Sequence, residues 1–160
     1  MNKKMSMILM LLVLSVFSMS SPQSEEIETL LNNGLTDTAE KLVQKLLLEH
    51  PDDLQLNYYL SVVYYQQKNF DKLAKQVDRC IILLESSIAT EAPETARIKF
   101  RISFYKGSMC LYQGNLKEAG KWLNIAQNIS SDDLDLHQVL LQYYCQLGEC
   151  GSAEKEHNWI

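Results

Sequence analysis

Apolar residues recur at helical spacing along most of this chain, and turn residues divide the apolar stretches at regular intervals. The clearest stretch is residues 111–126, LYQGNLKEAGKWLNIA. Tyr112 lies before a turn at Gly114, and apolar residues follow at helical spacing from Leu116 to Leu123. Glycine can adopt the left-handed conformation that ends a helix. The pattern therefore predicts two helices folded back on each other around one tight turn.

Similar patterns predict helices along the rest of the chain, and we expect an all-α fold. Two acidic pairs, 52–53 and 132–133, stand at breaks in the pattern and are predicted to cap the helix that follows. The expected helices cover residues 25–33, 36–48, 54–67, 70–86, 93–113, 116–128, 134–147 and 152–160.

The helical pairs repeat with a fixed register. One column of second-helix residues has spacings of 34, 46 and 34, and it contains Ala39, Leu73, Ala119 and Ala153. A second column stands at the turns and contains Gly34, Lys68, Gly114 and Gly148. The longer middle spacing is 34 plus an insertion of 12 residues. A common period in both columns predicts stacked helical hairpins, with an irregular helical bundle as the alternative.

A 34-residue helix-turn-helix period with a small residue early in the second helix resembles the tetratricopeptide repeat family. The resemblance covers nearly all of residues 24–160. Two departures stand out: Asn57-x-x-Leu60-Ser61 is the nearest approach to the family's Trp-x-x-Leu-Gly, and Leu73 replaces the usual alanine. The resemblance implies a right-handed superhelical stack of antiparallel helix pairs. We expect a signal peptide at 1–20 and a repeat domain at 21–160, with repeats at about 24–53, 54–86, 97–133 and a partial 134–160, and an insertion at about 87–96.

In this family the first helices of the repeats line a concave face that binds segments of other proteins, because no further repeat covers that surface. The resemblance therefore implies a partner-binding surface on this face. Its expected residues are Tyr58, Val62, Tyr65, Gln66, Arg101, Phe104, Ser108, Tyr112, Gln138 and Gln142. Aromatic rings give contact area at low entropic cost, and amides pair with a peptide backbone. Tyrosines at helical spacing are also common in protein cores, and the sequence does not decide whether these lie in the core or on the concave face. Because Arg101 is the one cation on the expected face, we do not predict the carboxylate clamp known in one branch of the family.

The N-terminus has the order of a secretory signal. Lys3 and Lys4 precede an uncharged apolar run at 5–19, and small residues follow at Ser18 and Ser20. The run is shorter than the roughly 20 residues that span a bilayer. We expect an exported protein, periplasmic or secreted, with no stable membrane insertion after cleavage; an uncleaved anchor is the alternative.

The net charge of the chain and its lack of known catalytic motifs exclude further classes of function. The formal charge of −5 becomes −7 without the two N-terminal lysines, which argues against nucleic acid as a partner. No glycine-rich phosphate loop and no nucleophile elbow appear in the sequence. We predict no enzymatic activity and no cofactor.

The four cysteines suggest structural roles. Cys145 and Cys150 flank the turn at Gly148, which makes them the candidate disulfide pair. For Cys80 and Cys110, buried free thiols are favoured over a bridge across the repeat junction. His137 and His157 have no metal-ligand spacing with these thiols, so no metal site is predicted.

The sequence therefore predicts a non-enzymatic, exported scaffold that holds a peptide or protein segment in a concave face. The alternative function is a structural subunit of a cell-envelope assembly that docks through its repeat ends. Trp159 and Ile160 are apolar at the C-terminal end, and solenoid ends normally need a polar cap. These residues either fold over the last helix as a minimal cap or form a surface for association through this end.

Overall fold

The computed structural model describes residues 22–86 and 92–160, and within them every regular element is an α-helix. The predicted signal peptide and residues 87–91 of the predicted insertion lie outside the described residues, so both stay predictions. The helices are α2 (Pro22–Asn32), α3 (Thr36–Glu49), α4 (Leu54–Gln66), α5 (Phe70–Ser86), α6 (Pro93–Tyr112), α7 (Leu116–Ile129), α8 (Leu134–Leu147) and α9 (Cys150–Trp159).

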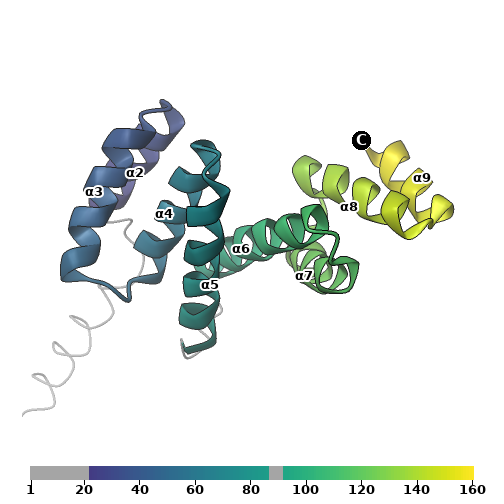
Figure 1. The fold of residues 1–160 in the computed structure, drawn as a ribbon. Coiled ribbons are helices and arrows are strands. Elements are labelled where there is room, and N and C mark those ends of the chain that lie inside the picture. The colour runs from purple at the N-terminus through teal and green to yellow at the C-terminus, as the bar shows by residue number, and fades with distance from the viewer. Residues whose placement is uncertain (1–21, 87–91) are drawn as a thin grey trace, which may run out of the picture.

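The helices form four successive pairs that stack along the molecule (Figure 1). Each helix packs against the next one in the chain, and α2, α4, α6 and α8 also contact one another in sequence. Among the described helices, the backbones of α3, α5, α7 and α9 do not approach one another closely, although the Lys72 side chain of α5 reaches Glu40 of α3 at 3.3 Å. We call the first set the inner helices and the second set the outer helices. The predicted all-α stack of antiparallel helix pairs is confirmed.

The residues at the four turns explain why the second helix of each pair folds back along the first. Gly34, Gly114 and Gly148 have φ of 71°, 75° and 75°, and Lys68 takes the same left-handed conformation at 56°. A side chain with a Cβ is strained in this region, so Lys68 holds it at an energetic cost. Four equivalent positions with one conformation confirm the register of the repeat.

The predicted caps form at two of the helix starts. The Asp53 side chain accepts a hydrogen bond from the Leu56 N–H at 2.8 Å, and Asp133 accepts one from Leu136 at 3.1 Å. Residues 93–96, at the end of the expected insertion and the start of the expected 93–113 helix, form the first turn of α6, with Pro93 at its start. A proline fits there because the first helical N–H has no intrahelical partner.

Small residues let the paired helices approach closely. Ala39, Leu73 and Ala119 are at most 1% exposed, and Ala153 is 8% exposed. Helices α6 and α7 approach closely at Gly107, where an added Cβ would lie 2.8 Å from two Leu123 side-chain atoms and 3.1 Å from the Leu123 backbone nitrogen. The α6–α7 pair therefore depends on a glycine inside a long helix.

The last pair is joined by a buried polar contact. The His137 Nε2–H donates to the Ser131 carbonyl at 2.6 Å, and Nδ1 faces the Glu156 carboxylate of α9. The Trp159 ring stacks on the imidazole with centroids 3.5 Å apart. These contacts fix α9 against α8.

We expect Gly107→Val to lower the free energy of unfolding by about 1–3 kcal/mol, because the new side chain meets the backbone of α7, which cannot move aside. The measurement is the urea midpoint of unfolding. Gly151→Ala is the matched control, since nothing lies within 4 Å of the added Cβ there. An unchanged midpoint for Gly107→Val would show that the pair does not need this close approach.

We expect His137→Ala to loosen α9, because it leaves the nearly buried Glu156 carboxylate without its partner. Leaving a buried polar group without its hydrogen-bond partner costs about 1–3 kcal/mol. Hydrogen exchange of the α9 amides should accelerate, while exchange in α4 stays the same. His157→Ala, an exposed histidine on the same helix, should have no effect. Equal α9 protection in both variants would contradict the role of the His137 contact.

Candidate protein-interaction surface

The structure buries two residues that the sequence predicts on the concave face. Tyr58 is 6% exposed and Phe104 is 4% exposed, so neither is open to a partner. The reason is that α4 and α6 contact helices on both sides, which leaves little of their circumference free. Arg97 lies over the Tyr58 ring at 5.5 Å, and burial raises the pKa of the Tyr58 hydroxyl. The prediction was wrong for these two aromatic residues.

Arg101 also forms ion pairs within the molecule. Its guanidinium lies 3.1 Å from the Asp133 carboxylate and 3.9 Å from that of Asp135, both at the start of α8. The side chain therefore joins two inner helices and is not a free cation. Gln138 and Gln142 are exposed on α8, and their predicted role in binding stays a prediction.

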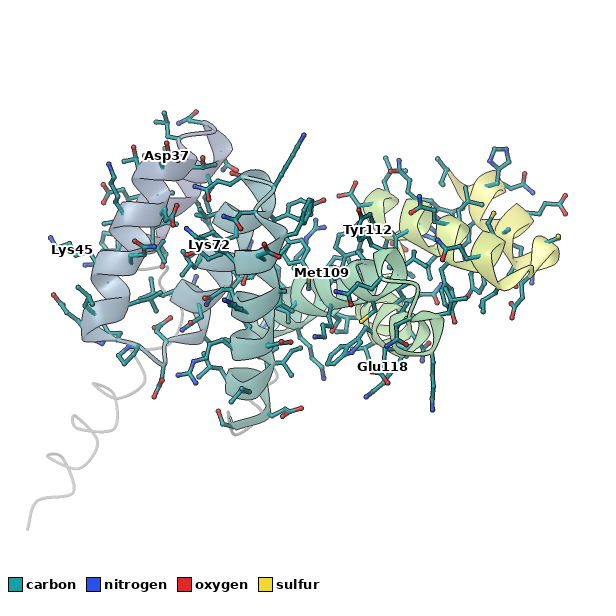
Figure 2. All side chains as sticks on the ribbon, in the orientation of Figure 1. Asp37, Lys45, Lys72, Met109, Tyr112 and Glu118 are labelled. Carbon is teal, nitrogen blue, oxygen red and sulfur yellow. The ribbon has the colours of Figure 1, made fainter. Side chains whose placement is uncertain are left out.

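Three predicted residues, Tyr65, Ser108 and Tyr112, line one pocket of about 400 Å³. We call it the aromatic pocket. It lies where the α4–α5 turn meets the C-terminal half of α6, and Met109 and Tyr112 mark it midway along the stack (Figure 2). Its lining residues are Tyr65, Phe70, Asp71, Leu73, Ala74, Tyr105, Ser108, Met109, Tyr112 and Gln113.

Four of the ten lining residues are aromatic. Tyr65 and Tyr105 stack with centroids 4.7 Å apart at 25°, and burial raises the pKa of the Tyr105 hydroxyl, which keeps this phenol uncharged. Phe70 is 59% exposed and Tyr112 is 94% exposed. Large apolar side chains that remain this exposed beside a cavity are typical of an interaction site.

The only carboxylate in the lining belongs to Asp71, in the first turn of α5. Within the described part of the chain, this carboxylate has no hydrogen bond and no ion pair. The neighbouring acids on the same face of the stack are paired, since Asp78 binds Lys106 at 2.7 Å and Glu40 binds Lys72 at 3.3 Å. Asp71 is therefore available to a partner.

A second, smaller pocket of about 200 Å³ is lined by the predicted residues Val62 and Gln66 and also by the mostly buried Tyr58. Its wall includes Arg97, which hydrogen-bonds Glu94 at 2.7 Å and Glu28 at 3.2 Å. The hydrogen bond to Glu94 is the main cause that raises the pKa of the Arg97 guanidinium. The charged groups of this pocket, Arg97 and Glu28, are already paired with each other, so it offers less to a partner than the aromatic pocket.

Sequence reasoning missed Phe70, Tyr105 and Asp71. Phe70 is the first residue of α5 and is 59% exposed. On α6 the predicted residue was Phe104, and the residue that lines the pocket is its neighbour Tyr105, about 100° further round the helix. The unpaired Asp71 had no signal in the sequence.

The cysteines are free thiols in the structure. The predicted disulfide is therefore corrected: Cys145 and Cys150 are exposed, and the Cys150 thiol faces the Gly148 carbonyl at 3.8 Å. Cys80 and Cys110 are buried, as favoured by the sequence. Residues 22–86 and 92–160 contain no cluster of potential metal ligands, and none of their helices is long and apolar enough to span a bilayer.

Comparison with solved structures identifies the architecture. A mutant of MamA, a tetratricopeptide-repeat protein, superposes with a TM-score of 0.59 at 18% identity, covering 91% of this chain and 77% of its own. A second MamA structure, from MSR-1, superposes with a TM-score of 0.56 at 18% identity and covers 81% of this chain and 68% of its own. The chain has a tetratricopeptide-repeat-like fold. No protein-family profile and no curated protein sequence matches it. At this identity the likeness to MamA establishes the fold alone.

We expect the four thiols of the tetratricopeptide-repeat-like chain to react with Ellman's reagent in two classes. Cys145 and Cys150 should react at once at pH 8. Cys80 should react only on unfolding, because burial raises its pKa to about 11 and removes the reactive thiolate. Cys110, whose pKa burial also raises, should behave like Cys80. Rapid reaction of all four in the folded protein would contradict the packing described above.

Proposed function

We propose that this protein is a non-enzymatic scaffold that binds a segment of another protein, and that the aromatic pocket is its main docking site. The fold supports the proposal, because stacked helix pairs leave continuous surfaces that no further repeat covers. Two pairs contribute to the pocket, so a bound segment would contact both at once. Such folds typically serve binding and not catalysis.

The observation that carries the proposal is the exposure of Phe70 and Tyr112 on either side of a formed cavity. Aromatic side chains dominate the energetics of protein interfaces because they bury a large area with few rotatable bonds. Tyr65, 43% exposed, continues the same surface. Leaving these rings in water opposes solubility, and a partner that covers them recovers that free energy.

We also propose that the protein is exported, because residues 1–20 carry the signal pattern described above. Its partner would then lie outside the cytoplasm. Docking through the C-terminal end stays a prediction. Trp159 there is 45% exposed but already stacks on His137, which leaves less of its ring for a second protein.

The double variant Phe70→Ala, Tyr112→Ala should lose its partner. We expect binding at least tenfold weaker, because truncating two interface aromatics costs about 2 kcal/mol or more. The measurement is quantitative co-purification from the native source with wild type, variant and control in parallel. Circular dichroism should show unchanged folding, since both side chains are mostly exposed.

Leu48→Ala, Ile82→Ala is the matched control, because these apolar residues are 85% and 55% exposed and do not line the pocket. A protein retained by wild type and control but lost by the pocket variant is the expected partner. Recovery of the same protein in equal amount by all three forms would rule the pocket out as the docking site.

A further inference from the structure

We propose that the aromatic pocket binds an arginine side chain of the partner segment. The proposal rests on the scaffold function above and adds the chemistry of the group that is recognised. Three observations support it: the arrangement of the rings, the unpaired carboxylate on the rim, and the polar acceptors beside them.

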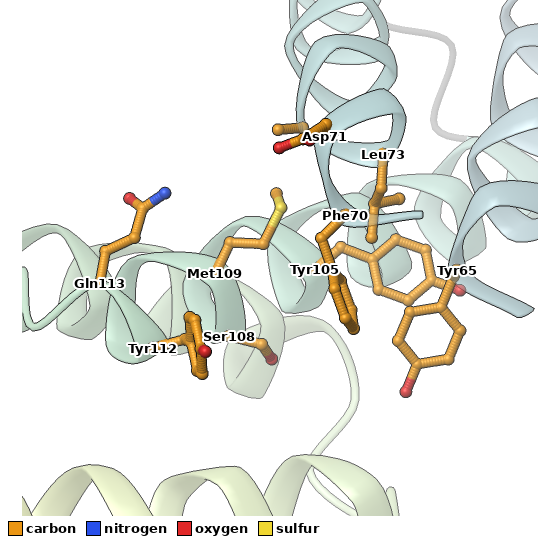
Figure 3. A pocket seen from close by; sticks show the side chains of 10 residues that line it. Tyr65, Phe70, Asp71, Leu73, Tyr105, Ser108, Met109, Tyr112 and Gln113 are labelled. Carbon is orange, nitrogen blue, oxygen red and sulfur yellow. The ribbon is translucent and has the colours of Figure 1, made fainter. Parts of the chain in front are cut away.

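The rings are placed to stack on a flat group. Figure 3 shows Phe70 and Tyr112 edge-on, on opposite sides of Ser108 and Met109, with the stacked Tyr65 and Tyr105 beyond Phe70. An arginine guanidinium is planar and stacks on aromatic faces through both dispersion and cation–π attraction. Its three-carbon stem can lie along the apolar part of the wall, which Leu73 and Met109 provide.

The charge of the pocket favours a cation. Asp71 is the one carboxylate of the lining, and no lysine or arginine lines the pocket. Lys106 and Lys72, on neighbouring surfaces, are tied to Asp78 and Glu40. Lys75 follows Asp71 by one helical turn and is exposed, but the two are not within ion-pair distance. A guanidinium that enters the pocket would therefore find a free counter-charge.

Further acceptors distinguish arginine from lysine. The Ser108 hydroxyl donates to the Phe104 carbonyl at 2.8 Å, so its oxygen lone pairs remain free to accept. The Gln113 amide oxygen and the Tyr112 phenol add two more acceptors to the lining. A guanidinium presents five N–H donors in one plane, whereas an ammonium presents three from a single point and cannot stack. The set of rings and acceptors fits the guanidinium better.

N-acetylarginine amide and N-acetylcitrulline amide provide the test, because they share their shape and differ in charge. The measurement is a titration of ¹⁵N-labelled protein at constant ionic strength, following the amide signals of Ser108, Met109 and Gln113. We expect saturable shifts with arginine and at least fivefold weaker binding of citrulline. Asp71→Asn should weaken arginine binding at least fivefold and leave citrulline binding unchanged.

Glu85→Gln is the matched control on the same helix, since this exposed carboxylate does not line the pocket and has no ion pair within the described residues, and arginine binding should be unaffected. Phe70→Ala should weaken both probes. Equal affinity for arginine and citrulline, or no effect of Asp71→Asn, would overturn the proposal. If only N-acetylphenylalanine amide binds, the pocket accepts an apolar side chain: the arginine assignment is then wrong and the scaffold function stands. If arginine binds but the co-purification finds no partner that depends on the pocket, the scaffold function is wrong and the arginine site itself stands.

Discussion

In every helix pair of this protein, one residue in the left-handed backbone conformation reverses the chain between the two helices. At Gly34, Gly114 and Gly148 this conformation has little cost, and at Lys68 the packing of the pair compensates for it. Without this conformation the second helix of a pair would not return along the first. The inner layer of helices, the burial of small residues between pairs, and the spacing of the pockets all depend on it.

The inner helices are nearly surrounded, and this explains why so few of their aromatic residues are open to a partner. Helices α4 and α6 pack against their own outer helix and against inner neighbours on both sides. One place where the stack leaves a cavity next to aromatic side chains is the meeting of α5 with α6, which run in different directions in Figure 1. The aromatic pocket is thus a consequence of how two adjacent pairs meet, and not of either pair alone.

Two arginines of α6 connect this central helix to its neighbours. Arg97 passes over the Tyr58 ring of α4 to reach Glu28 of α2, and Arg101 reaches Asp133 at the start of α8. Exposed ion pairs of this kind contribute at most about 1 kcal/mol each. Their more important effect is on the surface: they neutralise the cations of the inner face and leave Asp71 as the charged group of the aromatic pocket.

The sequence by itself determined the repeat. Helical periodicity, the turn residues and the cap at Asp133 are local features, because they depend on backbone conformations and on residues three or four positions apart. The tertiary structure alone decided which side chains face a partner. Neighbouring positions such as Phe104 and Tyr105 differ by about 100° round a helix. Which of them is buried depends on how the neighbouring helices pack against α6. That packing is set by contacts between residues on different helices, such as Gly107 with Leu123.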